Sequence, residues 1–184
     1  MLHMARHHPQ LQFEIVRGTD ALLQALRARM VDALVANARS IPPAADLQSE
    51  LLAEMRGAFM CRRGHPLMRR RRALTFADLS AFPIASTPLS DEVACILVER
   101  YRPLAHPEQC LTLRNDDITC LVDVVRQSDA ILLAVRVAGH DLVELVMRPA
   151  LEAKARFSLV TLAGRSEAPA VPLVRAFVKT LLKD

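Results

Sequence analysis

Three short polar turns in this sequence carry residue types that could hold a small anionic molecule. Thr19, the pair Ser86-Thr87 and the segment Asp117-Ile118-Thr119 each follow an apolar, strand-like run and precede a helix-like one. Backbone N–H groups at a helix start favour an anion, and hydroxyl groups beside them add directional hydrogen bonds. In open α/β sheets, ligands collect outside the carboxyl ends of the strands. This chemistry favours a carboxylate-bearing metabolite as the ligand.

The same polar residues have a second interpretation. Thr19, Ser90 and Asp116 are residue types that commonly cap helix starts, a role that needs no ligand. At the third turn the Asp117 side chain would repel an anion, so Ile118 and Thr119 are the expected contacts there.

Catalysis finds little support, and we expect no enzyme, no cofactor and no metal site. The sequence has no G-x-S-x-G elbow, no G-x-G-x-x-G after a strand, no phosphate loop and no H-E-x-x-H. The six histidines lack metal-ligand spacing, and the four cysteines stand alone, which predicts reduced, buried thiols. One alternative stays open, a cysteine nucleophile built from Cys120 or Cys61 with a distant histidine.

Length and composition predict a globular chain. With 184 residues and 52% hydrophobic residues, the chain can bury a core as one domain or two small lobes. No apolar run approaches the roughly 20 residues that cross a bilayer, and the first residues lack a secretory pattern. We therefore expect no membrane partner and a cytoplasmic location.

The net charge of +4 comes largely from six arginines between positions 62 and 72. A solvated connection between lobes is one interpretation of this run, and contact with phosphate or an acidic partner is the other. The absence of Trp and the single Tyr leave few stacking platforms for single-stranded nucleic acid.

Strand-like and helix-like segments alternate along the chain, which indicates an open, largely parallel α/β sheet, here two sheets. The period of two predicts a strand over 10–17, and Leu22, Leu23, Leu26 and Met30 share one helical face after it. A buried strand over 32–35 completes a βαβ unit. Further strands are expected at 57–61, 82–85, 110–113, 130–134, 145–147 and 157–162, with helices after Ser90, after Asp117 and from Pro172.

The order and the local sequence of these segments resemble the effector-binding domain of LysR-type transcription regulators. The sequence segments that carry the resemblance are His8-Pro9, Leu11 to Gly18, Leu22 to Leu34, Gly64-His-Pro-Leu67, Asp78-Leu79 and Phe82-Pro-Ile84. The resemblance covers nearly the whole chain. Two parts of the family pattern have no counterpart in this sequence: the winged helix-turn-helix and the first strand of lobe one. The chain would therefore start near the first helix of lobe one, at about 2–8.

The resemblance implies two Rossmann-like lobes of periplasmic-binding-protein type II, with a small effector between them. Lobe one would comprise residues 1–67 and 163–184, and lobe two residues 68–162. Asn37 matches a cleft position of the family, and Arg39 lies close to it, so both join the expected effector contacts. The family also implies a homodimer through the first and last helices, with packing of those apolar faces within the chain as the competing explanation, and DNA binding only through the absent domain. A free-standing solute-binding protein of the same fold is the alternative.

Overall fold

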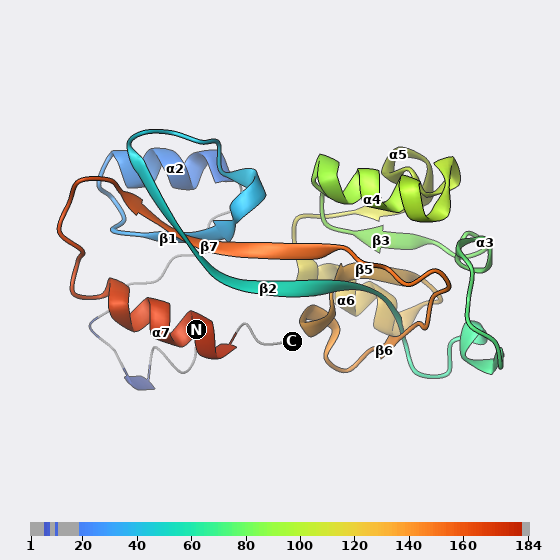
Figure 1. Ribbon diagram of the computed structural model, residues 1–184. Helices are drawn as coiled ribbons and strands as arrows, with labels where there is room; N and C mark the ends of the chain where they lie inside the picture. Colours follow the sequence, from blue (N-terminus) through green and yellow to red (C-terminus); the bar gives the residue numbers. More distant parts are fainter. Residues whose placement is uncertain (1–5, 8–9, 11–18, 182–184) are drawn as a thin grey trace. The chain divides into compact units, whose positions relative to one another are not determined.

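Two long strands, β2 (Leu47–Cys61) and β7 (Lys154–Leu162), each run through two compact units of the chain. The computed structural model describes residues 6–7, 10 and 19–181. Unit 1 comprises the residues up to Ala53 and those from Arg156 through the last helix, and unit 2 comprises Glu54–Ala155. Figure 1 shows helices beside the strands in each unit. The expected strand over 10–17 and most of the expected first helix lie outside the described residues.

Unit 1 is a small sheet covered by the helix α2. It contains α2 (Thr19–Arg27), β1 (Leu34–Asn37), the short helix η1 (Ala38–Ser40) and α7 (Val171–Leu181). Leu23 and Leu26 lie three residues apart on α2 and pack on Leu34 of β1 and Val160 of β7. This spacing buries one face of the helix, as its periodicity predicts. Met30, assigned to the same face, follows the helix and is 79% exposed.

Unit 2 has a central sheet in the order β2-β5-β3-β4, with β6 paired to β2. Its further strands are β3 (Ile84–Ser86), β4 (Leu111–Arg114), β5 (Ile131–Val135) and β6 (Val143–Glu144). Its helices are η2 (Pro66–Arg69), α3 (Phe76–Leu79), α4 (Asp91–Tyr101), η3 (Pro103–Ala105), α5 (Pro107–Cys110), α6 (Ile118–Gln127) and η4 (Arg136–Gly139). In Figure 1, α4 and α6 lie on opposite faces of this sheet.

Alternation along the strands builds two separate cores in unit 2. On β5, Ile131 and Leu133 join the cluster that contains Leu97 of α4, while Leu132 between them joins the cluster that contains Val125 of α6. Neighbouring residues of β2 and β3 divide in the same way. The cluster with Leu97 contains Phe59 and Cys61 of β2 and Ile84 of β3, and the cluster with Val125 contains Ala58 and Met60 of β2 and Ala85 of β3. Successive side chains of a strand point to opposite faces, so the buried residues of these strands are apolar, apart from the hydrogen-bonded Ser86 at the end of β3.

Strand directions differ from the expectation of a largely parallel sheet. β3 is parallel to β4 and β5, but β1 runs antiparallel to β7, and β2 runs antiparallel to β5 and β6. The strand expected at 57–61 begins at Leu47. The strand expected at 145–147 is wrong: β6 ends at Glu144, and Met147 makes only an isolated bridge to Leu74. The chain enters unit 2 within β2, so the arginine run lies wholly inside that unit.

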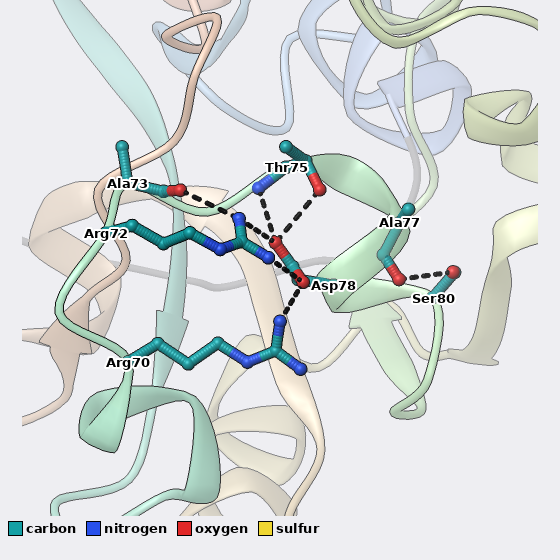
Figure 2. Close-up of polar contacts among 7 residues, drawn as sticks. All are labelled: Arg70, Arg72, Ala73, Thr75, Ala77, Asp78 and Ser80. Atoms are coloured by element: carbon teal, nitrogen blue, oxygen red, sulfur yellow. Dashed lines mark hydrogen bonds and ion pairs between the residues drawn. The ribbon is translucent and has the colours of Figure 1, made fainter.

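A buried carboxylate organises the arginine run. Asp78, 8% exposed, accepts hydrogen bonds from the backbone N–H and the hydroxyl of Thr75, both at 2.9 Å. Arg72 binds it through two nitrogens, at 2.9 and 3.0 Å, and Arg70 adds a third ion-pair contact. Figure 2 shows both guanidinium groups converging on the one carboxylate. The backbone N–H of Thr75 above all, helped by Arg72, lowers the pKa of Asp78 to about 2.

A histidine fixes the turn that precedes the arginine run. His65 is fully buried; its Nδ1 accepts from the Leu67 backbone N–H at 3.1 Å, and its Nε2 lies 3.0 Å from the Asp129 carbonyl oxygen. Because Nδ1 accepts, Nε2 carries the proton and donates to Asp129. The ring therefore connects the start of η2 to Asp129, two residues before β5 begins.

None of the helices in the described part of the chain is long and apolar enough to cross a membrane.

Asp78→Asn is expected to lower the free energy of unfolding by about 2 kcal/mol, because hydrogen bonds to a charged acceptor are lost. A carboxyl group with a lowered pKa stabilises the fold above its ordinary pKa of 3.8 and stops doing so as the pH falls towards about 2. The difference between the wild type and the variant, measured by urea denaturation, should therefore shrink between pH 4 and pH 2.

Asp129→Asn is the matched control, because the Asp129 to Arg62 ion pair is partly exposed, far more so than Asp78, and should contribute less than about 1 kcal/mol. Equal losses in the two variants would contradict the role assigned to Asp78.

Candidate functional site

The carboxyl ends of three parallel strands meet at one edge of the unit 2 sheet. Ser86, the last residue of β3, pairs with Arg114 of β4 and Leu133 of β5. The Asn115 backbone N–H donates to the Ser86 carbonyl oxygen at 3.4 Å, so the turn after β4 lies against the end of β3. We call this edge, with the turns 86–90 and 115–119 and the start of η4, the strand-end edge of unit 2.

Ser86 and Thr87 occupy different environments on this edge. Ser86 is fully buried, and its hydroxyl donates to the Leu133 carbonyl oxygen at 2.8 Å, so this hydroxyl ties β3 to β5. Thr87, the next residue, is partly exposed. Of these two expected contacts, Thr87 has the more accessible side chain.

Ser90 occupies the N-cap position of α4 without making the capping bond. Its backbone is extended, as a cap requires, yet its hydroxyl oxygen is buried and has no hydrogen-bond partner among the described residues. An unpartnered buried hydroxyl costs free energy unless something binds it. The sequence indicated Ser90 only as a cap, because nothing in the residue type distinguishes a bonded hydroxyl from an unbonded one.

At the third turn the helix start is already satisfied internally. The Asp117 carboxylate accepts from the backbone N–H of Thr119 at 3.0 Å and of Cys120 at 3.4 Å, so Asp117 is the N-cap and not Asp116. Ile118 packs partly buried against the core below α6. Thr119 is exposed and lines a shallow hollow on α6 together with the carboxylates of Asp117 and Asp123. These acidic neighbours oppose an anion at that surface.

Arg136 brings a positive charge to the same edge. It directly follows β5, is partly exposed, and donates through Nη1 to the Gly139 carbonyl oxygen at 2.8 Å. Its Nε lies 3.3 Å from Glu144, whose pKa is lowered chiefly by the hydrogen bond from Arg56. Sequence reasoning missed Arg136, although a cation directly after an apolar strand was the available signal.

The other expected residues lie in unit 1. Thr19 is the first residue of α2. Asn37 ends β1 and caps η1, and its Oδ1 accepts from the Arg39 backbone N–H at 3.2 Å. The structure thus brings Asn37 and Arg39 together in unit 1, and it brings Ser86 and Thr87 close to the turn 115–119 in unit 2.

A charged hollow of about 200 Å³ in unit 1 contains none of the expected residues. Arg175 lines it and pairs with Glu50 at 2.6 Å and with Glu167. Hydrogen bonds from Lys179 and Arg175 lower the pKa of Glu50, and the two glutamates raise the pKa of Arg175. These mutually neutralised charges make the hollow an ion-pair cluster with little net attraction for an anion.

Of the four thiols, Cys61 is buried, Cys110 is partly buried, and the other two are exposed. Burial raises the pKa of Cys61 to about 11 and also raises that of Cys110, which disfavours the nucleophilic thiolate. The expectation that all four are buried is wrong for Cys95 and Cys120, which lie on the outer faces of α4 and α6. In the described part of the chain, no three His, Cys, Asp or Glu side chains cluster as metal ligands would.

Ser86→Ala should lower the free energy of unfolding by about 1 kcal/mol, because it removes the bond to the buried Leu133 carbonyl. Thr87→Ala, the adjacent control, should change it by less than about 0.5 kcal/mol, since that side chain is partly exposed. Chemical denaturation of the unliganded chain measures both. A larger loss in Thr87→Ala than in Ser86→Ala would contradict these assignments.

Comparison with known proteins gives a consistent result. The sequence matches the family model described as the LysR substrate binding domain over residues 2–184. The SDS degradation transcriptional activation protein of Pseudomonas sp. is 31% identical over 180 residues, which cover 93% of this chain and 58% of that protein. This chain therefore spans little more than half the length of its curated relative.

Solved structures show the same fold. HinK, a LysR family transcriptional regulator from Pseudomonas aeruginosa, has a TM-score of 0.68 at 14% identity, covering 98% of this chain and 64% of its own. The regulatory domain of CcmR from Synechocystis in complex with 2-PG has a TM-score of 0.65 at 13% identity, with coverages of 99% and 88%. The effector binding domain of QuiR in complex with shikimate has a TM-score of 0.63 at 12% identity, with coverages of 98% and 87%.

At such low identities these structures establish the fold alone, a type II periplasmic-binding-protein-like arrangement of strands and helices. The family model covers almost every residue, and the curated relative, a transcriptional activation protein by name, aligns with 93% of this chain. The chain belongs to the LysR substrate-binding domain family.

Proposed function

We propose that this chain is the effector-sensing domain of a LysR-type transcription regulator and that its effector is a small carboxylate-bearing metabolite. The single observation that carries the proposal is the strand-end edge of unit 2. There, β3 lies between the parallel strands β4 and β5, and the turn that follows it carries the hydroxyl of Thr87. The buried hydroxyl of Ser90 has no hydrogen-bond partner among the described residues, and Arg136 adds a cation.

The geometry of this edge supports the contacts that we propose. Thr87 and Ser90 would donate hydrogen bonds to a carboxylate. Arg136, which pairs with Glu144 at 3.3 Å, would share its charge between Glu144 and the ligand. Ser86 would contribute through its backbone, since its hydroxyl already serves Leu133. Ile118 and Thr119 would lie at the border of the site. In unit 1, Thr19, Asn37 and Arg39 remain predicted contacts.

The ligands named for two structural relatives support this chemistry. Shikimate is bound by the QuiR domain and 2-PG by the CcmR domain. Both are small organic acids, which is the class that hydroxyl groups and an arginine at strand ends favour.

Sensing requires that the ligand favour one arrangement of the protein over another, since a ligand shifts an equilibrium only by its differential affinity. We propose that the chain acts in the cytoplasm, as a homodimer, and controls a DNA-binding domain joined to it. It would perform no catalysis. A free-standing solute-binding protein is the second candidate, because it shares the fold.

Isothermal titration with shikimate, 2-phosphoglycolate and a panel of small carboxylates tests the proposal. At least one of these acids should bind, and Thr87→Ala and Ser90→Ala should each weaken it about tenfold, which corresponds to one hydrogen bond to a charged group. Thr112→Ala, an exposed threonine within β4, is the control and should bind like the wild type. Unchanged affinity in both site variants would contradict the proposed edge.

The proposed regulator also predicts the behaviour of the chain in solution. Sedimentation should show a dimer, and a gel shift with the 184-residue chain should show no preference for an operator over a scrambled duplex, because base readout needs a domain that enters a groove. A monomer at micromolar concentration would contradict the proposed dimer. Sequence-specific binding by this chain would contradict the proposal that only the attached DNA-binding domain recognises bases.

A further inference from the structure

One end of unit 2 carries a concentration of positive charge that the effector site does not use. Between Glu54 and Asp78 the chain contains no acidic residue. Six arginines in this interval are exposed, and we call the five that lie between positions 63 and 72 the arginine face: Arg63, Arg69, Arg70, Arg71 and Arg72. Among the residues that the structure describes, the one carboxylate bound to this face is that of Asp78, which is 8% exposed and pairs with Arg70 and Arg72.

The arginine face is held in place by contacts from below. Asp78 fixes Arg70 and Arg72, as Figure 2 shows, and the neighbouring Arg62 pairs with Asp129 at 2.7 Å. The buried ring of His65 fixes the start of η2. Arg63, Arg69 and Arg71 have no carboxylate partner among the residues that the structure describes. Three cations are thus presented to solvent from a braced segment, where little backbone entropy is lost on binding.

The composition of the face indicates a phosphate backbone as its partner. Guanidinium forks match phosphate oxygens in geometry. A protein partner would need an apolar anchor at the centre of its interface, and Met68 is the one exposed large apolar residue of the segment 62–80. Phe76, the aromatic residue of that segment, is buried, so the face offers no stacking platform for unpaired bases.

We propose that the arginine face binds the phosphate backbone of duplex DNA without regard to sequence. This proposal rests on the proposed function, which places the chain beside DNA. Tethering makes a weak contact effective, because the local concentration of DNA is then high. Base recognition would stay with the attached DNA-binding domain, and the arginine face would add affinity and salt dependence.

Fluorescence anisotropy of the 184-residue chain with a labelled 25-base-pair duplex of arbitrary sequence tests this. We expect dissociation constants on the order of 10⁻⁵ M at low salt, in the range of non-specific binding. The triple variant Arg63→Gln, Arg69→Gln, Arg71→Gln should bind at least about tenfold more weakly. The slope of log K against log salt should fall by about 2 to 3, since each phosphate contact contributes roughly 0.9.

The control is Arg102→Gln, Arg148→Gln, Arg165→Gln, which removes the same charge from exposed positions elsewhere. It should stay within about threefold of the wild type. Equal weakening by the two triple variants would show that net charge alone binds DNA and would overturn the proposal. So would the absence of binding at low salt, or tighter binding of a labelled polyglutamate peptide or of anionic vesicles than of the duplex.

Two further readouts separate this proposal from the proposed function. Thermal unfolding should be unchanged in the triple variant of the arginine face, because Asp78 keeps both of its arginine partners. Titration with the carboxylate panel should also be unchanged. Loss of DNA binding with intact carboxylate binding supports both proposals, and intact DNA binding in this variant overturns only the arginine face.

Discussion

The structure of unit 2 depends on one constraint, that its central strands bury side chains on both faces. Ile131 and Leu133 face the layer of α4 while Leu132 faces α6, and the neighbouring strands divide in the same way. A polar side chain is tolerated in these strands only where its hydrogen bond is satisfied. Ser86 obeys this rule through Leu133, and the first hydroxyl groups available to a ligand therefore come at Thr87 and beyond.

Helix starts were the most predictable features of the chain, because their signals are local. Asp117 and Pro172 lie within one residue of the first residues of α6 and α7, and Ser90 directly precedes α4. The alternation of strands and helices was also enough to indicate an α/β fold with two parts. The strands of unit 2 read as continuous apolar runs with no alternation of polar residues, and this pattern predicts a sheet that is buried on both faces.

Strand direction and length could not be predicted locally. The residues 47–56 alternate weakly, and their pairing is decided by partners far along the chain, so β2 was expected ten residues too short. The arginine run looked like a linker because nothing in its sequence reveals that Asp78, six residues later, binds it from within the fold. At the site, the sequence shows which residues carry hydroxyl groups, but whether a hydroxyl makes a hydrogen bond depends on its rotamer and its neighbours. The Ser86 hydroxyl donates a hydrogen bond to Leu133, and the Ser90 hydroxyl has no partner among the described residues.

The passage of the chain between its two units inside β2 and β7 has an evolutionary consequence. A strand with both faces buried cannot gain or lose one residue, because every later side chain would turn to the opposite core. An insertion near Gly57 would exchange Phe59 with Ala58 and disrupt both clusters. Length variation among descendants of this sequence should therefore gather in loops such as 41–46 and 163–170, while the buried end of β2, residues 58–61, changes by substitution alone.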